Sequence, residues 1–83
     1  MLQAATMLTA AQIRAARAML GWKQTDLAKA ADISEMSVKK IEAGSVDPRV
    51  STITAIQTAF ETAGVIFLDA GQSRDGGPGL RLK

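Results

Sequence analysis

Apolar residues recur at helical spacing along most of the chain before its last twenty residues. The first clear set is Ile13, Ala16 and Leu20, which stand at i, i+3 and i+7 and therefore share one face of a helix. Gly21, directly after them, is suited to the left-handed conformation that ends a helix. The pattern predicts a first helix over residues 10–20.

The start of this first helix carries signals of its own. Thr9 and Gln12 stand three residues apart, as in a capping box, where each side chain accepts a hydrogen bond from the other residue's backbone N–H. Leu8 and Ile13 have the spacing of a hydrophobic staple. Met7 directly precedes these signals, and we treat it as a candidate start of the natural chain.

Two short helices joined by a brief turn are predicted next, which is the arrangement of a helix-turn-helix unit. The first covers residues 24–31 and follows Lys23, a poor N-cap because its side chain has no hydrogen-bond acceptor. Asp32 can adopt the left-handed conformation that ends this helix. The second covers residues 34–43, with Ser34 as its N-cap.

The helix over residues 34–43 has a thin apolar edge. Val38 and Ile41 are its only firm core anchors, and the other positions are mainly hydroxyls, charges and Met36. A helix held by two apolar side chains presents most of its surface away from the core. This pattern indicates that its exposed surface has a function of its own.

A fourth helix is predicted from Ile53, Ile56 and Phe60, which again stand at i, i+3 and i+7, and Gly64 ends it. The fold class is therefore mostly α, with four helices in a domain that we assign to residues 1–64.

A pair of strands is predicted in the remaining tail, residues 65–83. The first occupies 65–68 and the second 79–83, on either side of a glycine-rich turn region at 70–78. Both pleat faces of the first strand are apolar, and a strand of this kind is normally covered on both sides. We therefore favour a sheet shared with a second copy of the chain, and the alternative is a hairpin folded onto the fourth helix of its own chain. The residues expected in this dimer contact are Val65, Ile66, Phe67 and Leu68.

Composition removes several classes of protein. The chain has 83 residues and contains neither cysteine nor histidine. It lacks the commonest catalytic base and the commonest metal ligands, so no catalytic residue, metal site or cofactor is predicted, and we expect that the protein is not an enzyme. No apolar run approaches the roughly 18 residues needed to span a bilayer, and the N-terminus lacks the positive region of a signal peptide. A soluble cytoplasmic protein is expected.

Charge is weakly informative. The net charge is +2, yet the segment 50–69 carries only two ionisable residues, the acids Glu61 and Asp69. Such a distribution permits nucleic acid binding on one face of the protein but does not require it.

The middle of the chain, residues 13–65, resembles a known family. An ordered set of residues without gaps matches the Cro/repressor-type (Xre) helix-turn-helix, the lambda-repressor-like DNA-binding domain: Gln24, Leu27, Ala28, Ile33, Ser34, Val38, Ile41, Glu42, Gly44 and Pro48. The resemblance implies a four-helix fold that binds double-stranded DNA with its third helix in the major groove.

The resemblance also implies roles for individual residues. Bases would be read by Glu35, Met36 and Lys40, and an ion pair between Arg17 and Glu42 would fix the first and third helices together. The residues that would contact phosphates, some of which are equally compatible with a merely solvated surface, are Lys23, Gln24, Ser34, Ser37, Lys39 and Arg49. Trp22 is expected to be a hydrophobic plug between the first two helices.

The chain departs from the family pattern at three positions. Lys23 replaces the usual hydroxyl or asparagine N-cap, Asp32 replaces a turn glycine, and Ala43 replaces the asparagine before Gly44. These departures lower the expected affinity for DNA. They leave the predicted fold unchanged.

The favoured function is a homodimeric transcriptional regulator, most simply a repressor, that reads a palindromic operator. A narrower variant is the antitoxin of a toxin–antitoxin pair, with a toxin as its protein partner. A third hypothesis is a protein-interaction adaptor that uses the fold without reading DNA, which the modest charge, Asp32 and Glu35 keep open.

Overall fold

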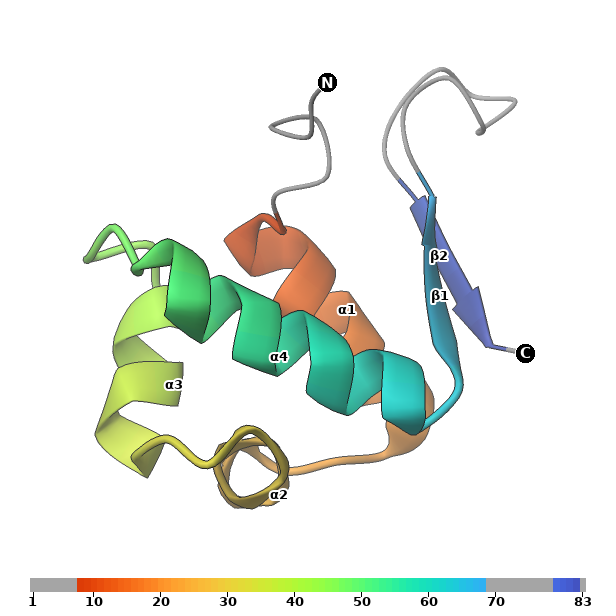
Figure 1. Ribbon diagram of the computed structural model, residues 1–83, viewed down its shortest axis with the longest axis horizontal. Coiled ribbons are helices and arrows are strands. Elements are labelled where there is room, and N and C mark those ends of the chain that lie inside the picture. The colour runs from red at the N-terminus through yellow and green to blue at the C-terminus, as the bar shows by residue number, and fades with distance from the viewer. Residues whose placement is uncertain (1–7, 69–78, 83) are drawn as a thin grey trace.

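Four helices and a two-stranded antiparallel sheet follow one another along the chain (Figure 1). The structure is a computed structural model and describes residues 8–68 and 79–82. Its elements are α1 (Ala10–Leu20), α2 (Gln24–Ala31), α3 (Glu35–Glu42), α4 (Val50–Thr62), β1 (Val65–Leu68) and β2 (Gly79–Leu82). The predicted fold class is confirmed. The candidate start at Met7 and the turn region 70–78 lie outside the described residues.

The ends of α1 have the predicted chemistry. The Gln12 backbone N–H donates to Thr9 Oγ1 at 3.1 Å, and the Thr9 N–H donates to Gln12 Oε1 at 2.9 Å, which completes the capping box. Gly21 ends the helix with φ 68°, a conformation that costs other residues roughly 1–2 kcal/mol. Both ends of this helix are therefore set by local sequence.

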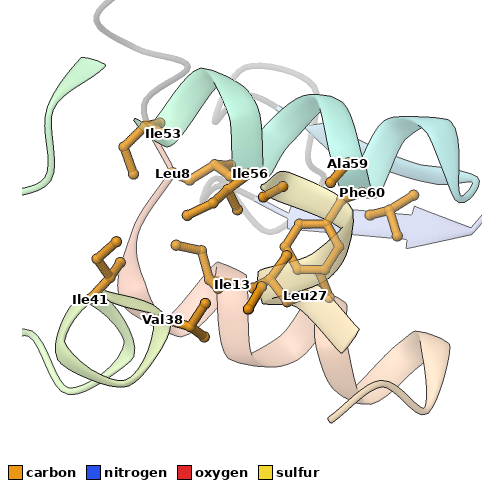
Figure 2. Close-up of a cluster of buried hydrophobic side chains, with 13 residues drawn as sticks. Leu8, Ile13, Leu27, Val38, Ile41, Ile53, Ile56, Ala59 and Phe60 are labelled. Atoms are coloured by element: carbon orange, nitrogen blue, oxygen red, sulfur yellow. The ribbon is translucent and has the colours of Figure 1, made fainter. Parts of the chain in front are cut away.

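A single apolar core joins the helices to the first strand (Figure 2). Its largest fully buried side chains are Phe60, Ile13, Leu27, Ile56, Val38 and Val65, which come from α1, α2, α3, α4 and β1. Each contributes roughly 1.5–3 kcal/mol on burial. The core of α3 is the pair that the sequence indicated, Val38 and Ile41.

Trp22 closes the corner between α1 and α2. It is partly buried against the core, and its ring stacks on Phe60 with centroids 5.6 Å apart and planes 25° apart. This contact confirms the expected hydrophobic plug.

The two strands pair within one chain. Val65 lies opposite Leu82 and Leu68 opposite Gly79, and the hairpin contacts both α4 and α1. Val65 is buried, while Phe67 is partly buried with its ring 6.0 Å edge-on from Phe60. One pleat face of β1 is thus covered by its own chain, as in the alternative arrangement considered above. A further sheet contact with a second copy stays a prediction.

Candidate nucleic-acid interface

Helix α3 has one buried side and one side that faces solvent. Val38 and Ile41 are 0% and 6% exposed, whereas Glu35, Met36 and Lys40 all lie on the outer surface and Met36 is 59% exposed. The three residues expected to read bases therefore share the accessible face of one helix. The buried residues of the helix are Val38, Ile41 and Glu42.

The first turn of α3 is held by two serines. Ser34 Oγ accepts from the Ser37 backbone N–H at 3.0 Å and donates to Ser37 Oγ at 2.9 Å. Both residues were expected at phosphates. In the protein alone the Ser34 hydroxyl caps the helix and bonds the Ser37 hydroxyl, so any phosphate contact would share these groups.

An ion pair runs along the outer face of α3. Lys39 Nζ lies 3.5 Å from Glu35 Oε2, with side chains 53% and 45% exposed. An exposed i,i+4 pair adds only about 0.3–0.5 kcal/mol to stability. Its larger consequence is electrostatic, because Lys39 partly offsets the negative charge that Glu35 would bring close to phosphates.

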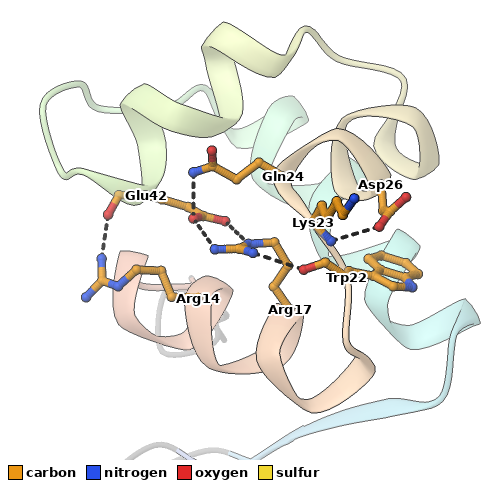
Figure 3. Close-up of polar contacts among 7 residues, drawn as sticks. All are labelled: Arg14, Arg17, Trp22, Lys23, Gln24, Asp26 and Glu42. Carbon is orange, nitrogen blue, oxygen red and sulfur yellow. Dashed lines mark hydrogen bonds and ion pairs between the residues drawn. The ribbon is translucent and has the colours of Figure 1, made fainter.

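The other end of α3 is fixed by a buried carboxylate (Figure 3). Glu42 is 4% exposed and accepts from Arg17 at both oxygens, with Nε to Oε2 at 2.8 Å and Nη2 to Oε1 at 3.0 Å. The expected ion pair between α1 and α3 is therefore present. Its two parallel hydrogen bonds give a geometry that a lysine could not reproduce.

Gln24 belongs to the same cluster. Its Nε2 donates to Glu42 Oε1 at 3.1 Å, so the side chain expected at a phosphate also ties α2 to α3. The amide has a second N–H, which can still serve an external acceptor. A phosphate at Gln24 would thus be connected to the third helix through one shared carboxylate.

Two further arginine contacts complete the cluster. Arg17 Nη1 donates to the Trp22 backbone carbonyl at 2.9 Å, and Arg14 Nη1 donates to the backbone carbonyl of Glu42. Every buried side-chain nitrogen and oxygen in the described residues has a hydrogen-bond partner. Arg14 is not among the residues that the sequence pattern assigns to the site. Its position three residues before Arg17, on the same face of α1, is the signal that could have found it.

The start of α2 is capped from within the helix. Asp26 Oδ2 accepts from the Lys23 backbone N–H at 2.8 Å, while the Lys23 side chain is exposed. Asp32 ends the helix with φ 58°, as predicted for the turn. The Lys23 side chain does not cap the helix and can therefore contact an external anion.

A groove of about 340 Å³ separates α3 from the loop before α4. Ser37 and Lys40 line it from α3, Val46 and Arg49 line it from the loop, and Thr52 lines it from α4. Three of the expected DNA contacts therefore meet along one edge of α3. Lys23 and Gln24 belong instead to the start of α2, where Gln24 contacts Glu42 at the last residue of α3.

Comparison with protein families assigns the helical part of the chain to a known family. A protein-family model described as Helix-turn-helix matches residues 13–64, more than half of the chain. No curated protein matches the chain. The family match ends just before β1, so the hairpin lies outside it.

Proposed function

Because the chain belongs to the helix-turn-helix family of DNA-binding regulators, we propose that it is a sequence-specific repressor that binds a palindromic operator as a homodimer. The observation that carries the proposal is the outer face of α3. Glu35, Met36 and Lys40 are exposed on a helix whose far end is locked to α1 through Glu42.

The chemistry of the three side chains suggests what they read. A carboxylate at Glu35 accepts from cytosine N4, the Met36 side chain contacts a thymine methyl, and Lys40 donates to guanine O6 and N7. Lys23, Arg49 and the free N–H of Gln24 would hold the flanking phosphates, which set register without reading sequence.

Dimerisation would place two copies of α3 in successive major grooves, about 34–36 Å apart. The sheet of the described residues has two strands, so each strand has one outer edge that another strand can pair with. Ile66, on the pleat face away from Val65, is partly exposed and suits the same contact. We therefore assign the tail 65–83 to dimerisation and the preceding residues to DNA.

Selection of binding sites from random duplexes, followed by footprinting, tests the proposal. We expect an enriched palindrome and an affinity that falls steeply with salt, because each neutralised phosphate releases a counterion. Lys40→Ala should weaken and relax the selection, whereas Lys29→Ala, on the exposed surface of α2, should leave the selected sequence unchanged.

Other outcomes favour the other hypotheses. If no palindrome is enriched and binding is no tighter than to bulk DNA, the repressor proposal fails and the adaptor hypothesis gains. If a palindrome is recovered and a protein encoded beside this chain also co-purifies and is neutralised by it, the regulator is an antitoxin.

A further inference from the structure

The last four carbonyl groups of α3 all have hydrogen-bond partners outside the helix. The last four carbonyl groups of a helix have no partner within the helix and need one elsewhere. Three of the four are satisfied by the turn that follows: Lys39 O by the Ala43 N–H at 3.0 Å, Ile41 O by the Gly44 N–H at 3.1 Å, and Lys40 O by the Ser45 N–H and hydroxyl, each at 3.1 Å. The fourth, on Glu42, accepts from Arg14 of α1.

Arg14 and Arg17 therefore hold the same residue in two ways (Figure 3). Arg17 binds the Glu42 carboxylate, while Arg14 binds its backbone carbonyl. A side-chain contact alone lets the helix move as the glutamate rotamer changes. A contact to the carbonyl holds the backbone of the helix directly. It also places a positive charge at the C-terminal end, where the helix dipole is negative.

We propose that Arg14 is a positioning residue for α3, which sets the angle at which the helix enters the groove without touching the bases. The inference rests on the proposed function, in which α3 reads DNA. It follows from the weak apolar anchoring of this helix, because Val38 and Ile41 alone leave its orientation to the polar contacts at its ends.

Arg14 is exposed, so a direct phosphate contact is the competing role. The two roles differ in their dependence on salt. Loss of one phosphate contact makes the negative slope of log K against log salt less steep by about 0.9, whereas loss of a positioning contact leaves that slope unchanged. A positioning residue also affects the selected operator more than a scrambled duplex, because only specific contacts depend on the helix angle.

The test uses the full chain in three variants. Arg14→Met keeps the apolar stem but has no donor, Arg14→Lys keeps a donor and the charge, and Lys29→Met removes one exposed positive charge from α2 as the matched control. Affinity is measured by fluorescence anisotropy for the selected and scrambled duplexes at several salt concentrations, at a temperature where circular dichroism shows each variant folded.

We expect Arg14→Met to lose about fivefold in affinity for the selected duplex, the order expected for one partly exposed hydrogen bond. The affinity of Arg14→Met for the scrambled duplex should fall no more than that of Lys29→Met. The salt slope should stay unchanged, and Arg14→Lys should keep most of the affinity that Arg14→Met loses. Equal losses in Arg14→Met and Lys29→Met, or a lower salt slope for Arg14→Met alone, would overturn the inference.

A second measurement does not depend on DNA binding. Hydrogen exchange of the amides at residues 42–45 should be faster in Arg14→Met than in Lys29→Met, because the end of α3 loses its link to α1. If exchange at these amides is no faster than in Lys29→Met, the inference is overturned. If Arg14→Met is too unstable for the binding assay, Arg14→Gln replaces it in both experiments. If the unmodified protein selects no operator, the proposed function fails, and the exchange result still decides whether Arg14 fixes the helix.

Discussion

The ion pair between Arg17 and Glu42 can be broken by substituting either residue, and the two substitutions should destabilise the protein by different amounts. Glu42 is 4% exposed and Arg17 23% exposed, so the carboxylate has almost no access to water whereas the guanidinium has some. Arg17→Met leaves a buried carboxylate with Gln24 as its only remaining side-chain donor among the described residues. Glu42→Gln instead leaves a cation that can turn toward solvent and a neutral amide that can still accept from it.

The magnitudes follow from this difference in burial. Removing one partner of a buried pair costs about 3–5 kcal/mol, and we expect Arg17→Met to cost about 3 kcal/mol because Arg17 is partly solvated. Glu42→Gln should cost about 1–2 kcal/mol, the range for a hydrogen bond to a charged group. The double variant should be more stable than Arg17→Met alone, since it no longer buries an unpaired charge.

Urea unfolding at one fixed protein concentration measures these values, with the fluorescence of Trp22 as the probe because the chain has a single tryptophan, stacked on Phe60. A loss of about 3 kcal/mol is a large part of the roughly 4–12 kcal/mol expected for a domain of this size. A loss below about 1 kcal/mol in Arg17→Met, or an equal loss in Glu42→Gln, would refute the reasoning that the carboxylate is the costly partner.

Three further changes test other contacts. Thr9→Ala removes half of the capping box and should cost about 1 kcal/mol, which lowers the melting temperature by about 4–8 °C, while Thr54→Ala on the exposed side of α4 should change it little. Gly21→Ala should cost about 1–2 kcal/mol in denaturant unfolding because of its φ of 68°, although its site has open space, and an unchanged midpoint would contradict this. Glu35→Gln should tighten binding to scrambled DNA, measured by anisotropy, and so reduce discrimination, because Lys39 without its carboxylate partner then faces phosphates; equal tightening for the selected and scrambled duplexes, or tightening for the selected duplex alone, would argue against it.

The helix boundaries could be predicted because their chemistry is local. Thr9 and Gln12 meet three residues apart, and Gly21 and Asp32 take the left-handed conformation that their types allow. Each of these signals lies within one turn of the helix end that it sets. No contact between distant parts of the chain is needed to read them.

The cluster at the end of α3 could be predicted only in part. The ion pair of Arg17 and Glu42 is predicted through the family resemblance, which implies that an arginine of the first helix pairs with a glutamate of the third. The spacing of Arg14 and Arg17 indicates that Arg14 lies on the same face of α1, but it does not show that Arg14 bonds a backbone carbonyl, because every residue has a carbonyl and the sequence does not show which one lacks a donor. Gln24 presents the same difficulty: its amide suits a phosphate and Glu42 equally, and the tertiary structure places it within 3.1 Å of the glutamate.

The hairpin shows a limit of the alternating pattern. Apolar residues on both faces of β1 indicate that both faces can be covered, but not by which element. The fold places Phe60 of α4 against the side of Val65 and Phe67, which needs no second copy. The opposite face is the one on which the expected dimer contact depends, and Ile66 is partly exposed there.

Glu35 is the residue that fits worst with a helix meant for DNA, and the structure gives a reason for its presence in the free protein. Helix α3 has eight residues, fewer than an isolated helix needs to form in water, so its ends must be stabilised from outside. An acid in the first turn complements the helix dipole, and Glu35 also pairs with Lys39. Ser34 and Glu35 thus stabilise the start of α3 as Arg14 and Arg17 stabilise its end. These polar contacts replace the apolar anchors that the helix lacks. The negative charge of Glu35 would in turn lower the affinity of the protein for bulk DNA.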